Sequence, residues 1–158
     1  MAGPLQGVVV LDLSRILAGP WATQVLADFG ADVVKIEHPR GGDDTRSWGP
    51  PYLRDEAGRD TTESAYYLSA NRGKRSVAID IATAEGQSLV RRLATQADVL
   101  VENYKVGGLA RYGLAYDDLA SLNPRLVYLS ISAFGQDGPA AAEPGYDAMI
   151  QAMGGLMS

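Results

Sequence analysis

The sequence contains no cysteine and only one histidine, His38. Without cysteine, the chain cannot form a disulfide, a thiolate nucleophile or a cysteine-ligated metal site. One histidine also argues against a histidine-built metal centre, and a Ser-His-Asp triad would have to use His38 itself. We therefore expect no metal site, and we expect any catalysis to depend on other residue types.

Basic charge and long apolar runs are also scarce. The chain has 14 Lys and Arg against 19 Asp and Glu, a net charge of -5. A general nucleic-acid binder usually has a basic face, so nucleic acid is not an expected partner. The first apolar run, residues 7–11, is too short for a signal sequence and follows no basic segment. No run is long enough to span a bilayer, so we expect a cytoplasmic protein that does not bind membranes.

Apolar residues nevertheless make up 46% of the 158 residues, which is enough to bury a core. Short apolar runs rich in β-branched residues are typical of buried parallel strands. Such runs predict five strands, at residues 8–13, 33–37, 76–80, 99–101 and 126–132.

Helical spacing between these runs predicts the crossover segments. Pro20 suits the first turn of a helix in which Trp21, Val25, Leu26 and Phe29 recur at helical spacing, and Gly30 suits its end. Thr83 is expected to cap a helix that reaches about residue 97, with a buried stripe formed by Leu89, Val90, Leu93 and Ala97. Shorter helices are expected near residues 65–68, 109–112, 116–122 and 146–153.

Strands that alternate with helices predict an α/β fold with a doubly wound, mostly parallel, Rossmann-like sheet. Residues 38–64, rich in glycine, proline and charge, are expected to form a long loop with a functional role. Leu156 and Met157 follow a helix stop as though another element were beginning, so the sheet is expected to be incomplete at the carboxyl end.

Two common nucleotide motifs are missing. The first strand is not followed by G-x-G-x-x-G, so Glu37 is expected to be a solvated strand end and not a ribose ligand. Gly73-Lys74 is not a phosphate-binding loop, because Arg75 stands where serine or threonine is required. Taken alone, the basic segment at residues 71–76 predicts a solvated turn.

The loop after the fourth strand carries a different set of ligand candidates. Asn103, Tyr104, Lys105 and Arg111 combine an amide, an aromatic ring and two cations that could stack a base and pair with phosphates. On residue type alone, Tyr104 is as well explained by packing. Asp147 begins the last helix, where an acid can simply favour the helix dipole.

Six segments, in this order, resemble the class III coenzyme A transferases (the CaiB/BaiF family). They are PLQGVVVLDLS at 4–14, LAGP at 17–20, LADFGADVVKIE at 26–37, NRGKRS at 71–76, DVLVEN at 98–103 and GYD at 145–147. The resemblance covers nearly all of the chain and makes residues 1–158 the amino-terminal part of the large domain of such an enzyme.

The resemblance implies transfer of coenzyme A from an acyl-CoA to a carboxylic acid, with no permanently bound cofactor. An aspartate would form a mixed anhydride and then an aspartyl-CoA thioester. By resemblance that aspartate lies beyond Ser158, so residues 1–158 alone are expected to be inactive. Family frequency favours a dicarboxylate acceptor, and the family forms interlocked homodimers.

The resemblance also implies a site. The positions that match the family's nucleotide contacts are Leu17, Ala18, His38, Ile79, Ala82, Asn103, Tyr104, Lys105 and Arg111. Some members have arginine in place of His38, so a phosphate contact there would depend on pH. Asp147 matches an acidic position on the wall of the active site.

Two other functions stay open. The family includes 2-methylacyl-CoA racemases, which typically carry a histidine directly before the acid matched by Asp147; here that residue is Tyr146, a poor base near neutral pH. A non-catalytic module that binds coenzyme A or another nucleotide is the second alternative.

Overall fold

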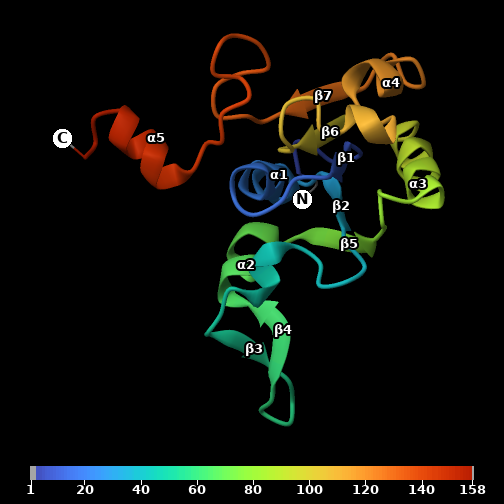
Figure 1. The fold of residues 1–158 in the computed structure, drawn as a ribbon. Helices are drawn as coiled ribbons and strands as arrows, with labels where there is room; N and C mark the ends of the chain where they lie inside the picture. The colour runs from blue at the N-terminus through green and yellow to red at the C-terminus, as the bar shows by residue number, and fades with distance from the viewer. Residues whose placement is uncertain (1–2, 158) are drawn as a thin grey trace.

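The computed structural model describes residues 3–157, and its centre is a five-stranded sheet with the order β5-β2-β1-β6-β7 (Figure 1). Every pair of neighbouring strands is parallel. The strands are β1 (Val9–Asp12), β2 (Asp32–Glu37), β5 (Lys74–Ala78), β6 (Val99–Glu102) and β7 (Val127–Ser130). The chain builds outward from β1 to β5 and then returns to place β6 beside β1, so the strand order reverses between β1 and β6. The predicted doubly wound α/β fold is confirmed.

Helices cover both faces of this sheet, and β1 shows how alternation divides the core. Val10 faces the side of α1 (Ala18–Asp28), where it belongs to a cluster that includes Leu26. Leu11 points the other way and packs in the cluster that contains Val90 of α3 (Ala84–Ala94). Successive strand residues therefore serve two cores, as the pleat requires.

The two long helices differ from the prediction in detail. Thr83 caps α3 as expected, by accepting a hydrogen bond from the Gly86 amide, but the helix ends at Ala94 and Leu89 is 44% exposed. The other helix, α1, begins two residues before Pro20. Its residue Gly19 is tightly enclosed, since a Cβ there would lie 2.2 Å from the Cβ atom of Ser14.

Three large apolar residues of α1 face outward. Trp21, Val25 and Phe29 are each about half exposed, whereas Gly19 and Thr23 are buried against the sheet. Small residues allow the helix to approach the strand ends closely, and this approach decides which side is buried. Periodicity therefore predicted the helix correctly, but of the four apolar residues at helical spacing only Leu26 packs against the core.

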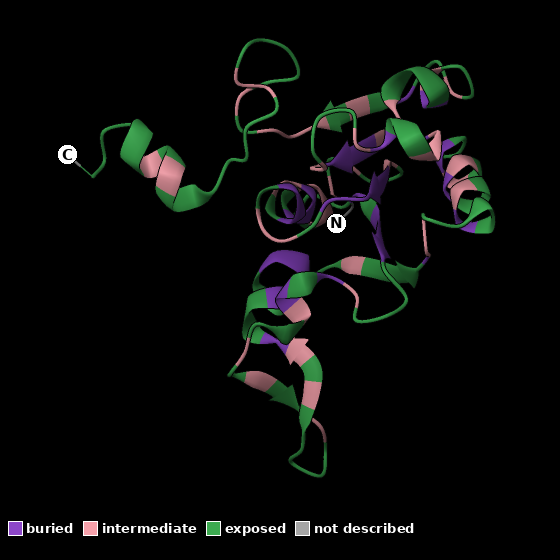
Figure 2. Cartoon of the chain, in the orientation of Figure 1, coloured by how far each residue is buried: buried purple, intermediate pink, exposed green. Residues whose placement is uncertain are grey.

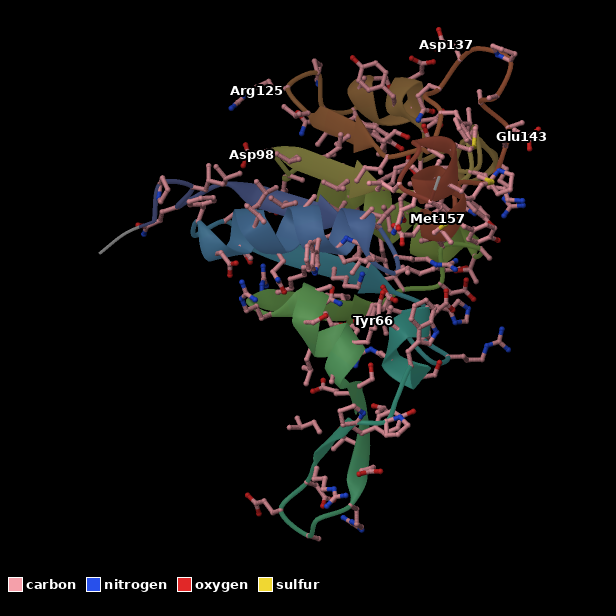
Figure 3. All side chains as sticks on the ribbon, turned by 90° about the vertical axis from the view of Figure 1, so that its left-hand side faces the viewer. Tyr66, Asp98, Arg125, Asp137, Glu143 and Met157 are labelled. Atoms are coloured by element: carbon pink, nitrogen blue, oxygen red, sulfur yellow. The ribbon has the colours of Figure 1, made fainter. Side chains whose placement is uncertain are left out.

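Residues 38–64 form more than a loop. They contain a 3₁₀ turn, η1 (Asp44–Ser47), and an antiparallel hairpin of β3 (Tyr52–Arg54) and β4 (Asp60–Ser64), followed by α2 (Ala65–Asn71). Figures 1 and 3 both show the hairpin projecting away from the sheet. Its strands are short and mostly exposed, and they contain no apolar run of the kind that predicted the central strands. The sequence analysis therefore did not predict them.

Two other predictions about this part of the chain were wrong. The strand β5 starts at Lys74, two residues before the predicted start, so the segment at 71–76 is not simply a solvated turn: the Lys74 side chain is only 2% exposed. Glu37 is also buried, at 5% exposure, and is not a solvated strand end.

The last elements leave the sheet. After η2 (Ala110–Tyr112), α4 (Tyr116–Ala120) and β7, a loop leads to α5 (Asp147–Met153), which has no buried residue (Figure 2). Leu156 and Met157 are 79% and 58% exposed, as predicted for an uncovered apolar end. Within residues 3–157, no helix has the length and apolar character needed to cross a membrane.

Candidate functional site

A cleft of about 460 Å³ lies at the carboxyl ends of the central strands. In a doubly wound sheet this edge, near the point where the strand order reverses, is where ligands bind. Four segments supply the cleft's charged and aromatic lining: the loops after β1, β2, β5 and β6, represented by Arg15, His38, Asp80 and Arg111.

The cleft brings together five of the predicted nucleotide-binding residues: His38, Ile79, Ala82, Tyr104 and Arg111. The His38 Nε2 atom lies 3.8 Å from Asp80 Oδ2, and its Nδ1 atom accepts a hydrogen bond from the Arg40 amide at 3.0 Å. His38 therefore lies beside an acid in the cleft.

The other predicted residues lie elsewhere. Leu17 and Ala18 stand at the start of α1 and do not line the cleft, whereas Lys105 lines a second cleft of about 480 Å³ between η2 and β7. Asn103 uses its side chain to hold the main chain of Arg15. Asp147 lies on α5, apart from the sheet, and accepts a hydrogen bond from Gln151.

Aromatic rings and guanidinium groups lie side by side in the main cleft. The Arg111 guanidinium lies 4.6 Å from the centre of the Tyr112 ring, and Arg15 lies 6.0 Å from the Tyr104 ring. Burial raises the pKa of the Tyr104 phenol, although Arg15 opposes the shift, so this group is neutral near pH 7. Such a set can pair with phosphate oxygens and can stack against a planar base.

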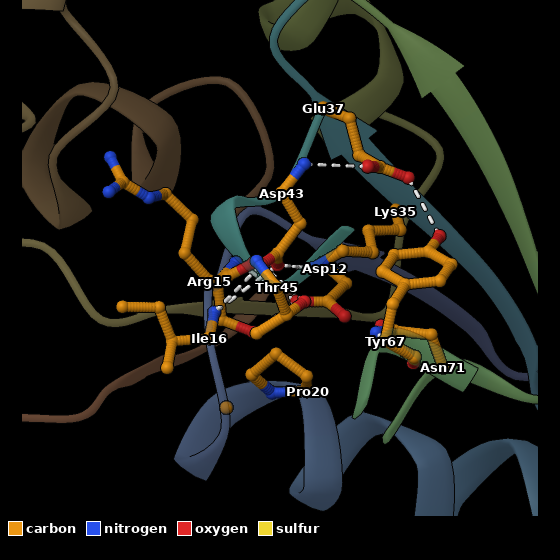
Figure 4. A network of polar contacts seen from close by, with 12 residues as sticks. Asp12, Arg15, Ile16, Pro20, Lys35, Glu37, Asp43, Thr45, Tyr67 and Asn71 are labelled. Atoms are coloured by element: carbon orange, nitrogen blue, oxygen red, sulfur yellow. Dashed lines mark hydrogen bonds and ion pairs between the residues drawn. The ribbon is translucent and has the colours of Figure 1, made fainter. Parts of the chain in front are cut away.

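A buried ion pair forms part of the same cleft lining (Figure 4). Lys35 Nζ is 2.9 Å from Asp43 Oδ2, and the two side chains are 1% and 0% exposed. Burial opposes ionisation of Asp43, but the Lys35 ammonium and the hydrogen bonds from Thr45 outweigh it and hold the pKa of Asp43 below its ordinary value. Lys35 reaches Asp43 from the middle of β2.

Glu37, two residues further along β2, is the centre of a second buried network. Its carboxylate accepts hydrogen bonds from Arg46, Tyr67, Ser76 and the Asp43 amide. Burial alone would raise the pKa of Glu37, but these hydrogen bonds, led by those from Arg46, lower it to about 2. The network ties η1 and α2 to β2, and so joins the base of the hairpin segment to the sheet.

A third network lies beneath α1. Lys74 Nζ is 3.0 Å from Asp12 Oδ2 and also donates to the Pro20 carbonyl and to Asn71. Asp12 accepts further hydrogen bonds from Ser14 and Thr23. Burial lowers the pKa of the Lys74 ammonium to about 8, although Asp12 opposes the shift.

These buried charges were not predicted as parts of the site. A signal was present: Lys35 interrupts the apolar run of β2, and a parallel strand buried on both faces has no place for an unpaired ammonium. The partner could not be found in the same way, because Asp43 lies in a segment whose path depends on η1 and the hairpin.

Comparison with known proteins agrees with this geometry. The family model of CoA-transferase family III matches residues 5–158. The chain is 56% identical over 155 residues to a succinate–glutarate CoA-transferase of Agrobacterium fabrum, covering 98% of this chain and 38% of that protein. It is 49% identical over 154 residues to a human succinyl-CoA:glutarate CoA-transferase, covering 98% and 34%.

A solved structure is also similar. The crystal structure of a CaiB/BaiF family protein from Brucella suis superposes with a TM-score of 0.92 at 54% identity, over 99% of this chain and 40% of that one. The chain thus spans somewhat more than a third of the length of these relatives. The family match, the identity and the sheet together lead to one conclusion: the chain belongs to CoA-transferase family III, the CaiB/BaiF family.

Proposed function

We propose that the whole protein transfers coenzyme A from an acyl-CoA to a carboxylic acid, and that the cleft at the strand ends holds the nucleotide end of the acyl-CoA. Residues 1–158 would be the amino-terminal part of the large domain. The observation that carries the proposal is the convergence of His38, Tyr104 and Arg111 on one cleft from loops far apart in the sequence.

The chemistry of the lining supports an anionic, partly aromatic ligand. Guanidinium groups match phosphate oxygens, and the Tyr104 and Tyr112 rings beside Arg15 and Arg111 offer surfaces for a base. The protein has a net charge of -5, so these few local cations, and not overall charge, would attract the ligand.

The proposed reaction needs a carboxylate nucleophile outside residues 1–158. Its oxygen would attack the thioester carbonyl, breaking the C–S bond and releasing the thiolate. The thiolate would then attack the aspartyl carbonyl of the anhydride and free the donor acid. The acceptor carboxylate would displace the thiolate from the aspartyl thioester and form a second mixed anhydride. The thiolate would finally attack the acceptor carbonyl of this anhydride, breaking its C–O bond, forming the new acyl-CoA and releasing the aspartate carboxylate. Asp147 is proposed to stand beside this exchange as an auxiliary acid.

We propose a dicarboxylate as acceptor, because the Agrobacterium and human relatives are named for glutarate. The test is an assay of the whole protein with succinyl-CoA and a panel of acids that includes glutarate and monocarboxylates of equal length. Formation of the new acyl-CoA, dependent on the added acid, is expected. Racemisation of a 2-methylacyl-CoA without acid-dependent transfer would overturn the proposal, and coenzyme A binding without turnover would favour a binding module.

We propose a homodimer whose chains interlock as the working form. The exposed apolar residues of α1 and α5 support a further layer of protein over these faces. Light scattering on the whole protein should give twice the mass of one chain, and the mass of a single chain would contradict this.

A further inference from the structure

We propose that Lys35 and Asp43 are positioning residues for acyl-CoA, because their buried ion pair holds the loop after β1 in the shape that presents Arg15 to the cleft. The inference deepens the proposed function and rests on it. Neither residue needs to carry out chemistry, since each would act through the loop at residues 14–16.

The main chain of this loop is held by side chains from other parts of the fold. Lys35 Nζ donates to the Ser14 carbonyl at 2.7 Å, and the Ile16 amide donates to the Asp43 carboxylate at 3.2 Å. Asn103 holds both sides of Arg15: its Oδ1 atom accepts from the Arg15 amide at 2.8 Å and its Nδ2 atom donates to the Arg15 carbonyl at 2.7 Å. The loop conformation is therefore imposed from outside.

Ile16 shows why such support is needed. Its φ angle is +67°, and it is the only residue other than glycine with positive φ in the described part of the chain. A β-branched side chain disfavours this left-handed region, so the conformation persists only where surrounding contacts enforce it. The hydrogen bond from the Ile16 amide to Asp43 supplies one of these contacts, and Lys35 holds Asp43 in place (Figure 4).

The side chain of Arg15 gains its position from the same arrangement. Its Nη2 atom lies 2.6 Å from Asp44 Oδ2, next to Asp43 in the chain, and the Arg15 side chain remains 51% exposed in the cleft. A loop that relaxed would move this cation relative to His38 and Arg111. Binding of the acyl-CoA would suffer before the chemical step, which depends on groups elsewhere.

The buried pair of Lys74 and Asp12 offers a matched control. Its side chains are 2% and 0% exposed, so it resembles the pair of Lys35 and Asp43 in burial. Lys74, however, joins β5 to α1 and α2 and lines neither cleft. Asp12 also accepts hydrogen bonds from Ser14, so the control variant is Lys74→Met, which leaves Asp12 in place. Both pairs should matter for stability, and the pair of Lys35 and Asp43, which contacts Ser14 and Ile16 directly, should have the larger effect on the shape of the loop.

The test compares Asp43→Ala, Lys35→Met and Lys74→Met in the full-length enzyme. We expect the first two to raise the KM for acyl-CoA on the order of tenfold with a much smaller change in kcat, and Lys74→Met to lower thermal stability without this KM effect. Asp43→Asn, which keeps an acceptor for the Ile16 amide, should fall between the unmodified enzyme and Asp43→Ala. It also serves as the test if Asp43→Ala does not fold.

A rescue experiment separates positioning from general stability. Glycine adopts positive φ without steric cost. Adding Ile16→Gly to Asp43→Ala should therefore reverse part of the rise in KM, whereas adding it to Lys74→Met should restore none of the lost stability. Hydrogen exchange gives a readout independent of turnover: in Asp43→Ala, the peptide containing Ile16 should exchange faster, and in Lys74→Met it should not.

Two outcomes would overturn the inference: an unchanged KM in both Asp43→Ala and Lys35→Met, or an equal rise of KM in Lys74→Met. If the unmodified full-length enzyme binds no acyl-CoA, the proposed function fails instead. In that case hydrogen exchange of the peptide containing Ile16 still decides whether Asp43 holds the loop. An exchange rate in Asp43→Ala equal to that of the unmodified enzyme would refute this role of Asp43.

Discussion

The strand-end edge of the sheet and the outer faces of α1 and α5 contrast sharply in how their side chains are satisfied. At the edge, charged residues are deeply buried, yet no buried side-chain nitrogen or oxygen in residues 3–157 lacks a hydrogen-bond partner. On the outer faces, large apolar side chains are open to solvent: Trp21 is 57% exposed and Met153 is 67% exposed.

The difference teaches which interactions must be completed within this part of the chain. A buried charge without its partner is costly, so the polar networks have to close as the sheet forms. Exposed apolar area costs much less per residue, and another surface can cover it later. The edge therefore completes its polar contacts within residues 3–157, whereas the outer faces of α1 and α5 keep apolar area exposed.

The largest effect should come from breaking a buried ion pair at the edge. Asp12→Ala leaves the Lys74 ammonium buried without its carboxylate, and we expect a loss of about 3–5 kcal/mol in the free energy of unfolding. Urea denaturation of the whole protein measures it. The control is Asp32→Ala, which removes the partner of Arg75 in an exposed pair of the same sheet and should cost at most about 1 kcal/mol.

A double variant sharpens this result. Asp12→Leu with Lys74→Met replaces both charges by apolar groups and should recover much of the stability lost in Asp12→Ala. If the double variant is no more stable than Asp12→Ala, the loss comes from packing and not from an unpaired charge.

Acid should lower the free energy of unfolding by protonating Glu37. Its folded pKa of about 2 lies below the ordinary value of 4.5, so the stabilisation is fully present above pH 4.5 and is lost as the pH falls from 4.5 towards 2. The size of the shift corresponds to about 3 kcal/mol. The stability difference between the unmodified protein and Glu37→Gln should therefore shrink over this range in denaturation experiments, and a difference independent of pH would argue against the assignment.

Within the edge, Arg111 tests ligand binding and not stability. Arg111→Ala in the full-length enzyme should raise the KM for acyl-CoA by an amount equivalent to about 1.5–3 kcal/mol, the usual worth of a charge-assisted hydrogen bond. Arg125→Ala removes an exposed cation that precedes β7, at the opposite end of the strands, and should leave the KM unchanged (Figure 3). An unchanged KM in Arg111→Ala would remove this residue from the site.

The smallest change in stability is expected on the outer faces. A polypeptide of residues 1–158 should aggregate through its uncovered apolar surfaces, and Trp21→Lys should raise its solubility while changing the free energy of unfolding by no more than about 0.5 kcal/mol. Light scattering and the soluble fraction measure the first effect. Leu11→Lys, at a core position that is 2% exposed, should instead prevent folding.

The features predicted best from the sequence are those that depend on short segments of the chain. The five strands followed from continuous apolar runs. His38 was expected in the site from the family resemblance and Arg111 from its place in the loop after the fourth strand, and the structure places both in one cleft at the carboxyl ends of the strands. The outward face of α1 could not be predicted, because the close approach of Gly19 to Ser14 decides it. The pairing of Lys35 with Asp43 was also out of reach, since it requires the path of a segment without apolar periodicity.

The two hydrogen bonds between the Asn103 side chain and the Arg15 main chain also determine when the cleft can form during synthesis of the protein. The two residues are separated by 88 positions. At translation rates of roughly 5–20 residues per second, Arg15 is added to the chain roughly 4–18 seconds before Asn103. The contact between the loops after β1 and β6 can therefore form only after both strands have been made, and until then a nascent chain lacks this wall of the cleft.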